Sequence, residues 1–183
     1  MINDKYVWVS SFHAKNNKRI NVRYVLPGDE AYFIDIFEHM SEESRYQRFN
    51  QTHNNLSLQK MKAEAHQMIE VTLHNGNGLI AFAEVEGETA VPIAVARYVK
   101  MDEETAEAAM SVRDDMHGQG IGTILFKQLI EEAKRDGLNT LVGLMQNSNT
   151  AMWVIFDRLP YPVKRTPDGT VSDIEIDLTQ FKA

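Results

Sequence analysis

The feature that most constrains the fold of this chain is a glycine-rich segment at residues 116–123, Met-His-Gly-Gln-Gly-Ile-Gly-Thr. Residues 106–112, just before it, are mostly apolar and predict a largely buried strand. Residues 121–135, just after it, carry apolar side chains at helical spacing and charged ones on the opposite side, which predicts an amphipathic helix. Gly137 can adopt the left-handed conformation of a C-cap, so we expect this helix to end there.

A strand, a glycine turn and a helix in this order suit the binding of an anion. The first backbone N–H groups of a helix lack partners within it and lie at the positive end of its dipole, so they bind phosphate well. Gly118, Gly120 and Gly122 lack the Cβ atoms that would keep an anion away from those N–H groups. For the glycines alone, a plain tight turn is an equally good interpretation.

Two common nucleotide motifs do not fit this segment. A P-loop ends in Gly-Lys-Ser/Thr, whereas Gly122 is followed by Thr123 and Ile124. The dinucleotide motif Gly-x-Gly-x-x-Gly would begin at Gly118 and would place Thr123 where glycine or alanine is required. In addition, no acidic residue ends the next expected strand, residues 140–145.

The segment instead resembles the acetyl-coenzyme A signature of the GNAT acetyltransferase superfamily, Arg/Gln-x-x-Gly-x-Gly/Ala. Both required glycines are present, and His117 replaces the usual first residue. In this family, backbone N–H groups hold most of the pyrophosphate, and a backbone N–H near Val112 would stabilise the thioester oxyanion. The resemblance therefore implies acetyl-CoA as the co-substrate, held by Val112, His117, Gly118, Gln119, Gly120, Ile121, Gly122 and Thr123.

A second resemblance points to the Pat-type protein lysine acetyltransferases, which contain Arg-x-x-x-Pro-x-Asp followed by Leu-Ser-x-Glu-Ser-x-Tyr-x-Arg-Phe. Met40 replaces the leucine of this pattern, and the matching residues are Arg23, Pro27, Asp29, Ser41, Glu43, Ser44, Tyr46, Arg48 and Phe49. The Pat-type pattern Glu-x-Ala-x-x-Val also matches, at Glu107, Ala109 and Val112. The chain is thus similar to the acetyltransferase domain of Pat-type enzymes.

This resemblance implies transfer of an acetyl group to a primary amine by direct attack. Freeing the lone pair of a lysine amine at neutral pH costs on the order of 4–5 kcal/mol, a cost that a positioned base helps to meet. Glu107 is the candidate base, although a surface glutamate in the acidic run 102–107 is the better interpretation without the resemblance. The preferred acceptor is a protein lysine. A small amine and a catalytically silent acyl-CoA-binding module are the alternatives.

Residues 149–156 are expected to form a helix capped by Ser148 or Asn149. Asn149 and Met152 match the Asn-x-x-Met contact of GNAT enzymes to the cofactor, although a simple helix cap explains Asn149 nearly as well. Many family members have a tyrosine seven residues after this asparagine, which protonates the departing thiolate. Phe156 occupies that position, so we expect water or no side chain in this function.

The expected fold is α/β (α+β), the GNAT fold, with a mixed, mostly antiparallel sheet that has a central splay and flanking helices. We expect one domain over residues 1–183, with an extra strand at residues 6–12 of the N-terminal segment 1–18. A helix at 58–69, turns at 74–78 and 86–88, and a C-terminal hairpin at 161–178 are also expected.

Composition limits the function classes further. The chain has 43% hydrophobic and 25% charged residues, no apolar run of about 20 residues and no signal-peptide core, so we expect a cytoplasmic protein without membrane contact. It has no cysteine, and its histidines lack metal-ligand spacing, so we expect no thiol chemistry and no metal. A net charge of −7 disfavours a nucleic-acid partner and is compatible with a cationic amine acceptor. Monomer and homodimer stay open.

Overall fold

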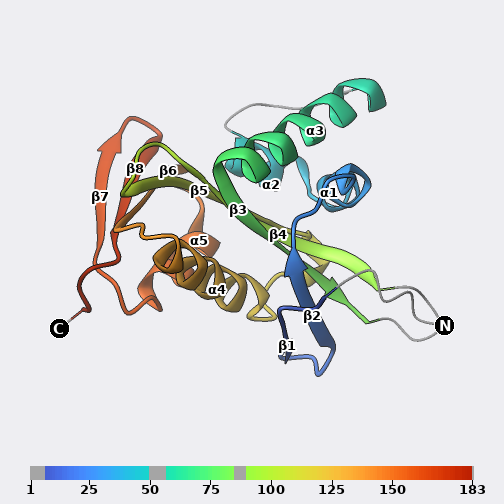
Figure 1. Ribbon diagram of the computed structural model, residues 1–183, viewed down its shortest axis with the longest axis horizontal. Helices are drawn as coiled ribbons and strands as arrows, with labels where there is room; N and C mark the ends of the chain where they lie inside the picture. Colours follow the sequence, from blue (N-terminus) through green and yellow to red (C-terminus); the bar gives the residue numbers. More distant parts are fainter. Residues whose placement is uncertain (1–6, 50–56, 85–89, 183) are drawn as a thin grey trace.

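The computed structural model describes residues 7–49, 57–84 and 90–182, and its strands form one eight-stranded sheet (Figure 1). The sheet order is β1-β2-β3-β4-β5-β6-β8-β7, and every neighbouring pair is antiparallel except β5 and β6, which are parallel. The predicted mixed, mostly antiparallel sheet is therefore confirmed. The strands are β1 (Ser10–His13), β2 (Arg19–Tyr24), β3 (Gly76–Ala83), β4 (Val91–Lys100), β5 (Thr105–Val112), β6 (Thr140–Gln146), β7 (Val163–Asp168) and β8 (Val171–Asp177).

Helices cover both faces of the sheet, with α1–α3 on one face and α4 and α5 on the other (Figure 1). Because successive side chains of a strand point to opposite faces, β3 contributes Leu79 and Ala81 to the core beneath α4, and Ile80 and Phe82 to the core beneath α1 and α3. The helices are α1 (Glu30–Glu38), α2 (Glu42–Phe49), α3 (Leu58–Asn75), α4 (Ile121–Arg135) and α5 (Thr150–Asp157).

A buried ion pair fixes the turn between β2 and α1. Arg23 donates to both carboxylate oxygens of Asp29, at 2.7 and 2.9 Å, and the backbone N–H of Leu26 donates to the same carboxylate at 2.8 Å. Both charged residues are almost fully buried, at 2% and 3% exposure. The Arg-x-x-x-Pro-x-Asp part of the Pat-like pattern therefore has a structural function here, because it joins the first long strand to the first helix.

The prediction for the end of α3 was wrong. The helix continues to Asn75, six residues beyond the expected end, and β3 begins at Gly76 without an intervening turn. The Asn75 amide donates to the carbonyl oxygen of Lys100 at 2.7 Å, which ties the helix end to β4. A Cβ atom on Gly76 would lie 2.0 Å from the carbonyl oxygen of Tyr98, so glycine is needed here for close approach of two strands.

The ends of the chain largely follow the predictions. The N-terminal strand is shorter than expected and begins at Ser10, while Tyr6 lies outside the described residues. The C-terminal hairpin is formed by β7 and β8, and Gly169 between them has a positive φ of 59°. The expected turn at 86–88 lies outside the described residues. Within the described part of the chain, no helix combines the length and apolar character that a membrane span requires.

Candidate active site

A splay in the middle of the sheet creates the main cavity. The parallel strands β5 and β6 pair only from Thr105 to Glu107 and from Thr140 to Val142, and beyond these residues they separate. The other edge of β5 stays paired with β4 as far as Val112. A cavity of about 600 Å³ occupies the opening, which is within the usual size range of small-molecule sites. The expected central splay is therefore confirmed.

The glycine turn lies at the mouth of this cavity. Gly118 and Gly120 have positive φ values of 73° and 81°, and Gly120 is the N-cap of α4. Among the described residues, no backbone hydrogen bond uses the N–H groups of Gly118, Gln119 or Gly120 as donors. Together with the free N–H groups in the first turn of α4, they form a concave set of donors that suits a pyrophosphate.

The predicted turn residues do not all have the same function. Gly118, Gly120, Ile121 and Thr123 line the cavity. Gly122 also lines it, but a Cβ atom there would lie 3.2 Å from Ile155 and 3.3 Å from Met110, so this glycine mainly allows α4 to pack closely.

Gln119 does not line the cavity, and instead its carbonyl oxygen accepts a hydrogen bond from the backbone N–H of Lys15 at 3.1 Å. Of the predicted turn residues, Gln119 is the one that does not line the cavity, so only its free backbone N–H is assigned to the proposed site.

His117 folds back toward the end of β5. Its Nε2 atom lies 3.0 Å from the carbonyl oxygen of Val112 and 3.8 Å from Asp114. Burial by itself would raise the pKa of Asp114, but hydrogen bonds from Ser41 and Ser44 and the nearby His117 lower it. Asp114 thereby joins the start of α2 to the residues that precede the glycine turn.

Glu107 is the last β5 residue paired with β6, so it lies where the two strands separate. Met110 and Val112 pack toward Gly122 of α4, and strand alternation therefore places Glu107 on the opposite face of the sheet, toward α1 and α2. Its side chain is exposed and lines the cavity. The N–H of Arg113 donates to Ile93 of β4, so alternation directs the N–H of Val112 into the splay.

Comparisons with known proteins agree with the splayed sheet and the glycine turn described above. A model described as the Acetyltransferase (GNAT) family matches residues 34–159. The chain belongs to the GNAT family. It is 32% identical over 141 residues to the acetyltransferase Pat of Mycolicibacterium smegmatis, covering 75% of this chain and 40% of Pat. It is 36% identical over 59 residues to an L-methionine sulfoximine/L-methionine sulfone acetyltransferase of Pseudomonas aeruginosa, covering 32% of this chain and 34% of that enzyme.

Solved structures show the same fold. The GNAT domain of S. lividans PAT has a TM-score of 0.75 and 22% identity, with 92% of this chain and 96% of that chain covered. The putative acetyltransferase yncA of Salmonella typhimurium, solved with its cofactor acetyl-CoA, has a TM-score of 0.66 and 18% identity, with 90% and 96% covered. The chain spans less than two thirds of the length of the curated relatives that it matches.

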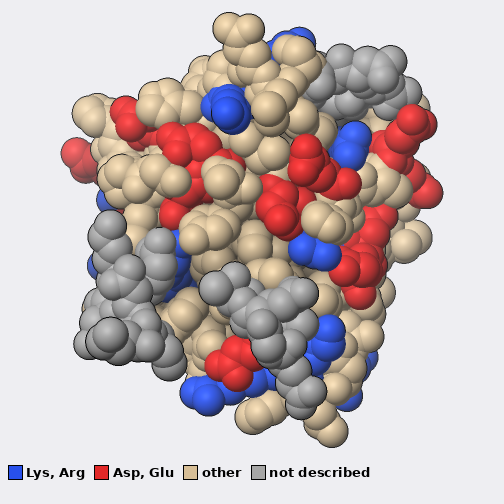
Figure 2. All heavy atoms as spheres, turned by 90° about the vertical axis from the view of Figure 1, so that its right-hand side faces the viewer, with Lys and Arg blue, Asp and Glu red and all other residues tan. Residues whose placement is uncertain are grey.

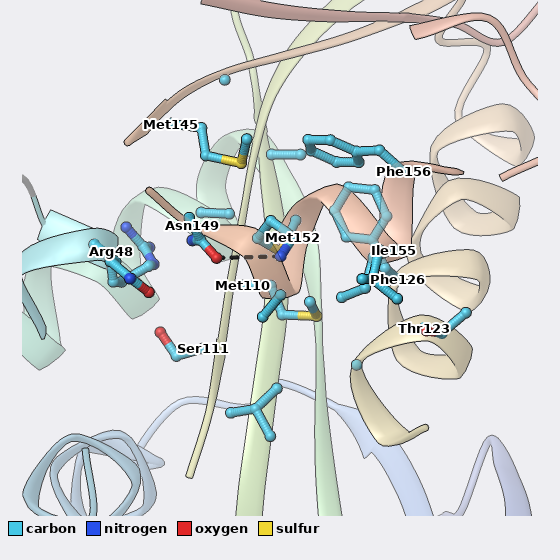
Figure 3. Close-up of a pocket in the computed structure, with 18 of the residues that line it drawn as sticks. Arg48, Met110, Ser111, Thr123, Phe126, Met145, Asn149, Met152, Ile155 and Phe156 are labelled. Atoms are coloured by element: carbon cyan, nitrogen blue, oxygen red, sulfur yellow. Dashed lines mark hydrogen bonds between the residues drawn. The ribbon is translucent and has the colours of Figure 1, made fainter. Parts of the chain in front are cut away.

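The helix after β6 begins where the sequence predicts. Asn149 is the N-cap of α5, and its Oδ1 atom accepts a hydrogen bond from the backbone N–H of Met152 at 3.1 Å (Figure 3). Both residues line the cavity, and the cap uses only the oxygen of the amide. The helix cap and a contact to the cofactor are therefore compatible functions of this residue.

Phe156 lies on the apolar side of the cavity in this GNAT chain. It is buried, and its ring centroid lies 6.0 Å from that of Phe126 (Figure 3). The ring centroid of Trp153 lies 5.8 Å away. A phenyl ring has no ionisable proton, so this position cannot supply the general acid that a tyrosine supplies in many relatives.

Several basic residues in or next to the cavity, among them Lys15, Arg48 and Arg97, were not predicted as site residues. Lys15 lines it, and its Cε atom would lie 4.0 Å from a Cβ atom on Gly120, which places an ammonium group beside the glycine turn. Arg48 of α2 lines the same cavity, and Arg97 of β4 lines a smaller hollow that adjoins it and shares Arg48. Arg48 had a signal in the Pat-like pattern. Lys15 and Arg97 had none, because only the fold brings them to the site.

Proposed function

We propose that this GNAT chain binds acetyl-CoA in the splay and transfers its acetyl group to a primary amine. The observation that carries the proposal is the set of free N–H groups at Gly118, Gln119 and Gly120 beside a cavity that follows the unpaired edge of β5. These N–H groups and Lys15 would hold the pyrophosphate, and the Val112 N–H would face the thioester carbonyl. The fold shared with a structure that contains acetyl-CoA supports this assignment.

The reaction needs a base, because a primary amine arrives mostly as ammonium. Glu107 accepts one proton from this ammonium, and the freed lone pair forms the bond between nitrogen and the acetyl carbon. The nitrogen then loses a second proton to solvent, and the carbon–sulfur bond breaks with its electron pair on sulfur. The sulfur takes a proton from water because Phe156 supplies none. In total, ammonium and thioester give amide, thiol and one proton.

Two acceptor classes have support. The likeness to Pat-type enzymes supports a protein lysine, and the shorter match to an amino-acid acetyltransferase supports a small amine. Arg48, which lines the cavity, and Arg97, which lines the adjoining hollow, favour the second class.

Calorimetry with acetyl-CoA tests the binding site. Gly120→Glu places a side chain and a negative charge in the N–H cradle and should abolish binding. Gly169→Glu is the matched control, because Gly169 also has a positive φ but lies in the turn of the C-terminal hairpin and does not line the cavity. Equal affinity of the wild type and Gly120→Glu would contradict the assignment of the glycine turn.

Release of CoA thiol in the presence of amines and lysine-containing proteins tests the chemistry. The chain has no cysteine, so the background of protein thiols is absent. Acceptor-dependent release is the expected result. Binding of acetyl-CoA without release by any acceptor would instead indicate a silent acyl-CoA-binding module.

A further inference from the structure

Two arginines beside the splay have side-chain donors without partners. The Nε atoms of Arg48 and Arg97 are buried and make no hydrogen bond. No ion pair among the described residues uses either guanidinium. A buried polar group without a hydrogen-bond partner is destabilising, and more so when it is charged, so two such groups side by side require an explanation.

The fold places this arginine pair on the same side of the sheet as Glu107. Arg97 lies opposite Ala109 of β5, in the diagonal position to Glu107 on the same face of the sheet. Arg48 comes from α2, which covers that face, and Figure 3 shows Arg48 and Ser111 on one side of the pocket and Phe126, Ile155 and Phe156 on the other. The pocket thus has a cationic side beside Glu107 and an apolar side beneath α4 and α5.

The charge of this cleft is opposite to that of the whole chain. The chain has a net charge of −7, and acidic side chains gather over much of the face that Figure 2 shows. In the cleft, two guanidiniums act on each other and on Glu107, which is exposed. Burial, and next the charge of Arg97, lowers the pKa of Arg48 to about 10, against the opposing effect of Glu107. The pair is cationic at neutral pH and is only partly compensated.

We propose that Arg48 and Arg97 bind a carboxylate of the acceptor, and that the acceptor is a small amino acid. A carboxylate is planar and accepts paired hydrogen bonds from guanidiniums, which fits two arginines better than a neutral group does. In a free amino acid the ammonium and the carboxylate are bonded to one carbon, which matches a base on β5 beside one cation on the neighbouring strand β4 and another on α2. The proposal rests on the function proposed above and names its acceptor class.

Matched acceptors test this inference. Each free L-amino acid is compared with its carboxamide in the thiol-release assay, and a lysine-containing peptide amide is included. The best free amino acid should exceed its carboxamide by about 10- to 100-fold in kcat/KM, the range expected for losing charged hydrogen bonds. Equal rates for acid and amide, or a peptide lysine as the best acceptor, would overturn the proposal.

Variants of the two arginines separate binding from folding. Arg97→Gln and Arg48→Gln should raise KM for the free amino acid about tenfold or more, leave KM for acetyl-CoA unchanged and have little effect on the carboxamide. Arg97→Lys should restore part of the loss. Arg19→Gln is the control, because Arg19 lies on β2, pairs with Glu84 at 3.7 Å and does not line the cavity. An unchanged KM in both glutamine variants would refute the carboxylate site.

Ligand-observed NMR makes this test independent of turnover. Amino acids are added to the wild type and to Arg97→Gln in the presence of CoA. Binding by the wild type that is lost in the variant would support the arginine site even if no acetyl transfer occurs, in which case only the proposed reaction fails. Binding of acetyl-CoA without binding of any amino acid would overturn the arginine site and leave the cofactor assignment intact.

Discussion

Replacement of Glu107 by glutamine tests the proposed base, because it removes the carboxylate at the point where β5 and β6 separate and preserves the shape of the side chain. General-base assistance contributes about 10²- to 10⁴-fold in enzymes. Glu107 is exposed, so water competes for the proton, and we expect kcat at pH 7 to fall by about 100-fold, the lower end of that range. The KM for an acceptor that carries a carboxylate should not rise, because the negative charge of Glu107, which partly compensates Arg48 and Arg97, is removed.

The pH profile identifies the cause of this loss. The acceptor amine is mostly protonated at pH 7, and its free fraction rises about tenfold for each pH unit until the pH reaches the pKa of the amine. The variant depends on this free fraction, so its rate should rise about 100-fold between pH 7 and pH 9. The wild type deprotonates the bound ammonium, so its rate should change much less over the same pH range. The difference in rate between the wild type and Glu107→Gln should therefore nearly disappear at pH 9.

Glu104→Gln is the control for this experiment, since Glu104 belongs to the same acidic run but does not line the cavity. It should have wild-type kinetics at every pH. Two parallel profiles for the wild type and Glu107→Gln, or equal rates at pH 7, would refute the function of Glu107 as a base. Stopped thiol-release assays with saturating acetyl-CoA provide the rates, and thermal unfolding shows whether the variants keep their fold.

Three further predictions concern the parts that hold the site together. Asp29→Asn leaves Arg23 buried with a weakened partner and should lower the free energy of unfolding by about 3–5 kcal/mol, measured in urea, whereas a loss below about 1 kcal/mol would contradict the buried ion pair. Lys15→Ala should weaken acetyl-CoA binding by about fivefold at low salt and much less at high salt, and an unchanged affinity would exclude Lys15 from the phosphate site. Asn149→Ser keeps a side-chain oxygen for the cap, so it should change the free energy of unfolding by less than about 0.5 kcal/mol. It should still weaken acetyl-CoA binding, because the amide nitrogen is lost. An affinity equal to that of the wild type would show that Asn149 is only a helix cap.

The region around the glycine turn could be predicted because its signals are local. The apolar run of β5, the positive-φ glycines and the apolar stripe of α4 each depend on residues within a few positions in the chain, and all of them point to the same strand–turn–helix unit. The buried ion pair between Arg23 and Asp29 likewise had a local signature, although its structural function became visible only from its burial.

The end of α3 could not be predicted because its cause is not local. Gly76 and Gly78 were interpreted as turn residues from their neighbours in sequence. In the fold, a Cβ on Gly76 would collide with the Tyr98 carbonyl and one on Gly78 would lie 2.8 Å from Val25. Both contacts come from residues that are distant in sequence, so glycine is needed here for close packing and not for a turn.

The same reasoning explains why the acceptor could not be derived from the sequence. The Pat-like pattern contains Arg48 and thereby pointed to a protein lysine, but a sequence pattern does not show where the side chain of Arg48 points. Arg97 lies on a different strand and had no signal at all, and the pair exists only because α2 covers the face on which β4 presents Arg97 beside Glu107. A family motif can therefore specify the donor half of the site, where backbone N–H groups bind a common cofactor. The acceptor half depends on which side chains the fold brings together, and in the proposed site these are two cations and one carboxylate.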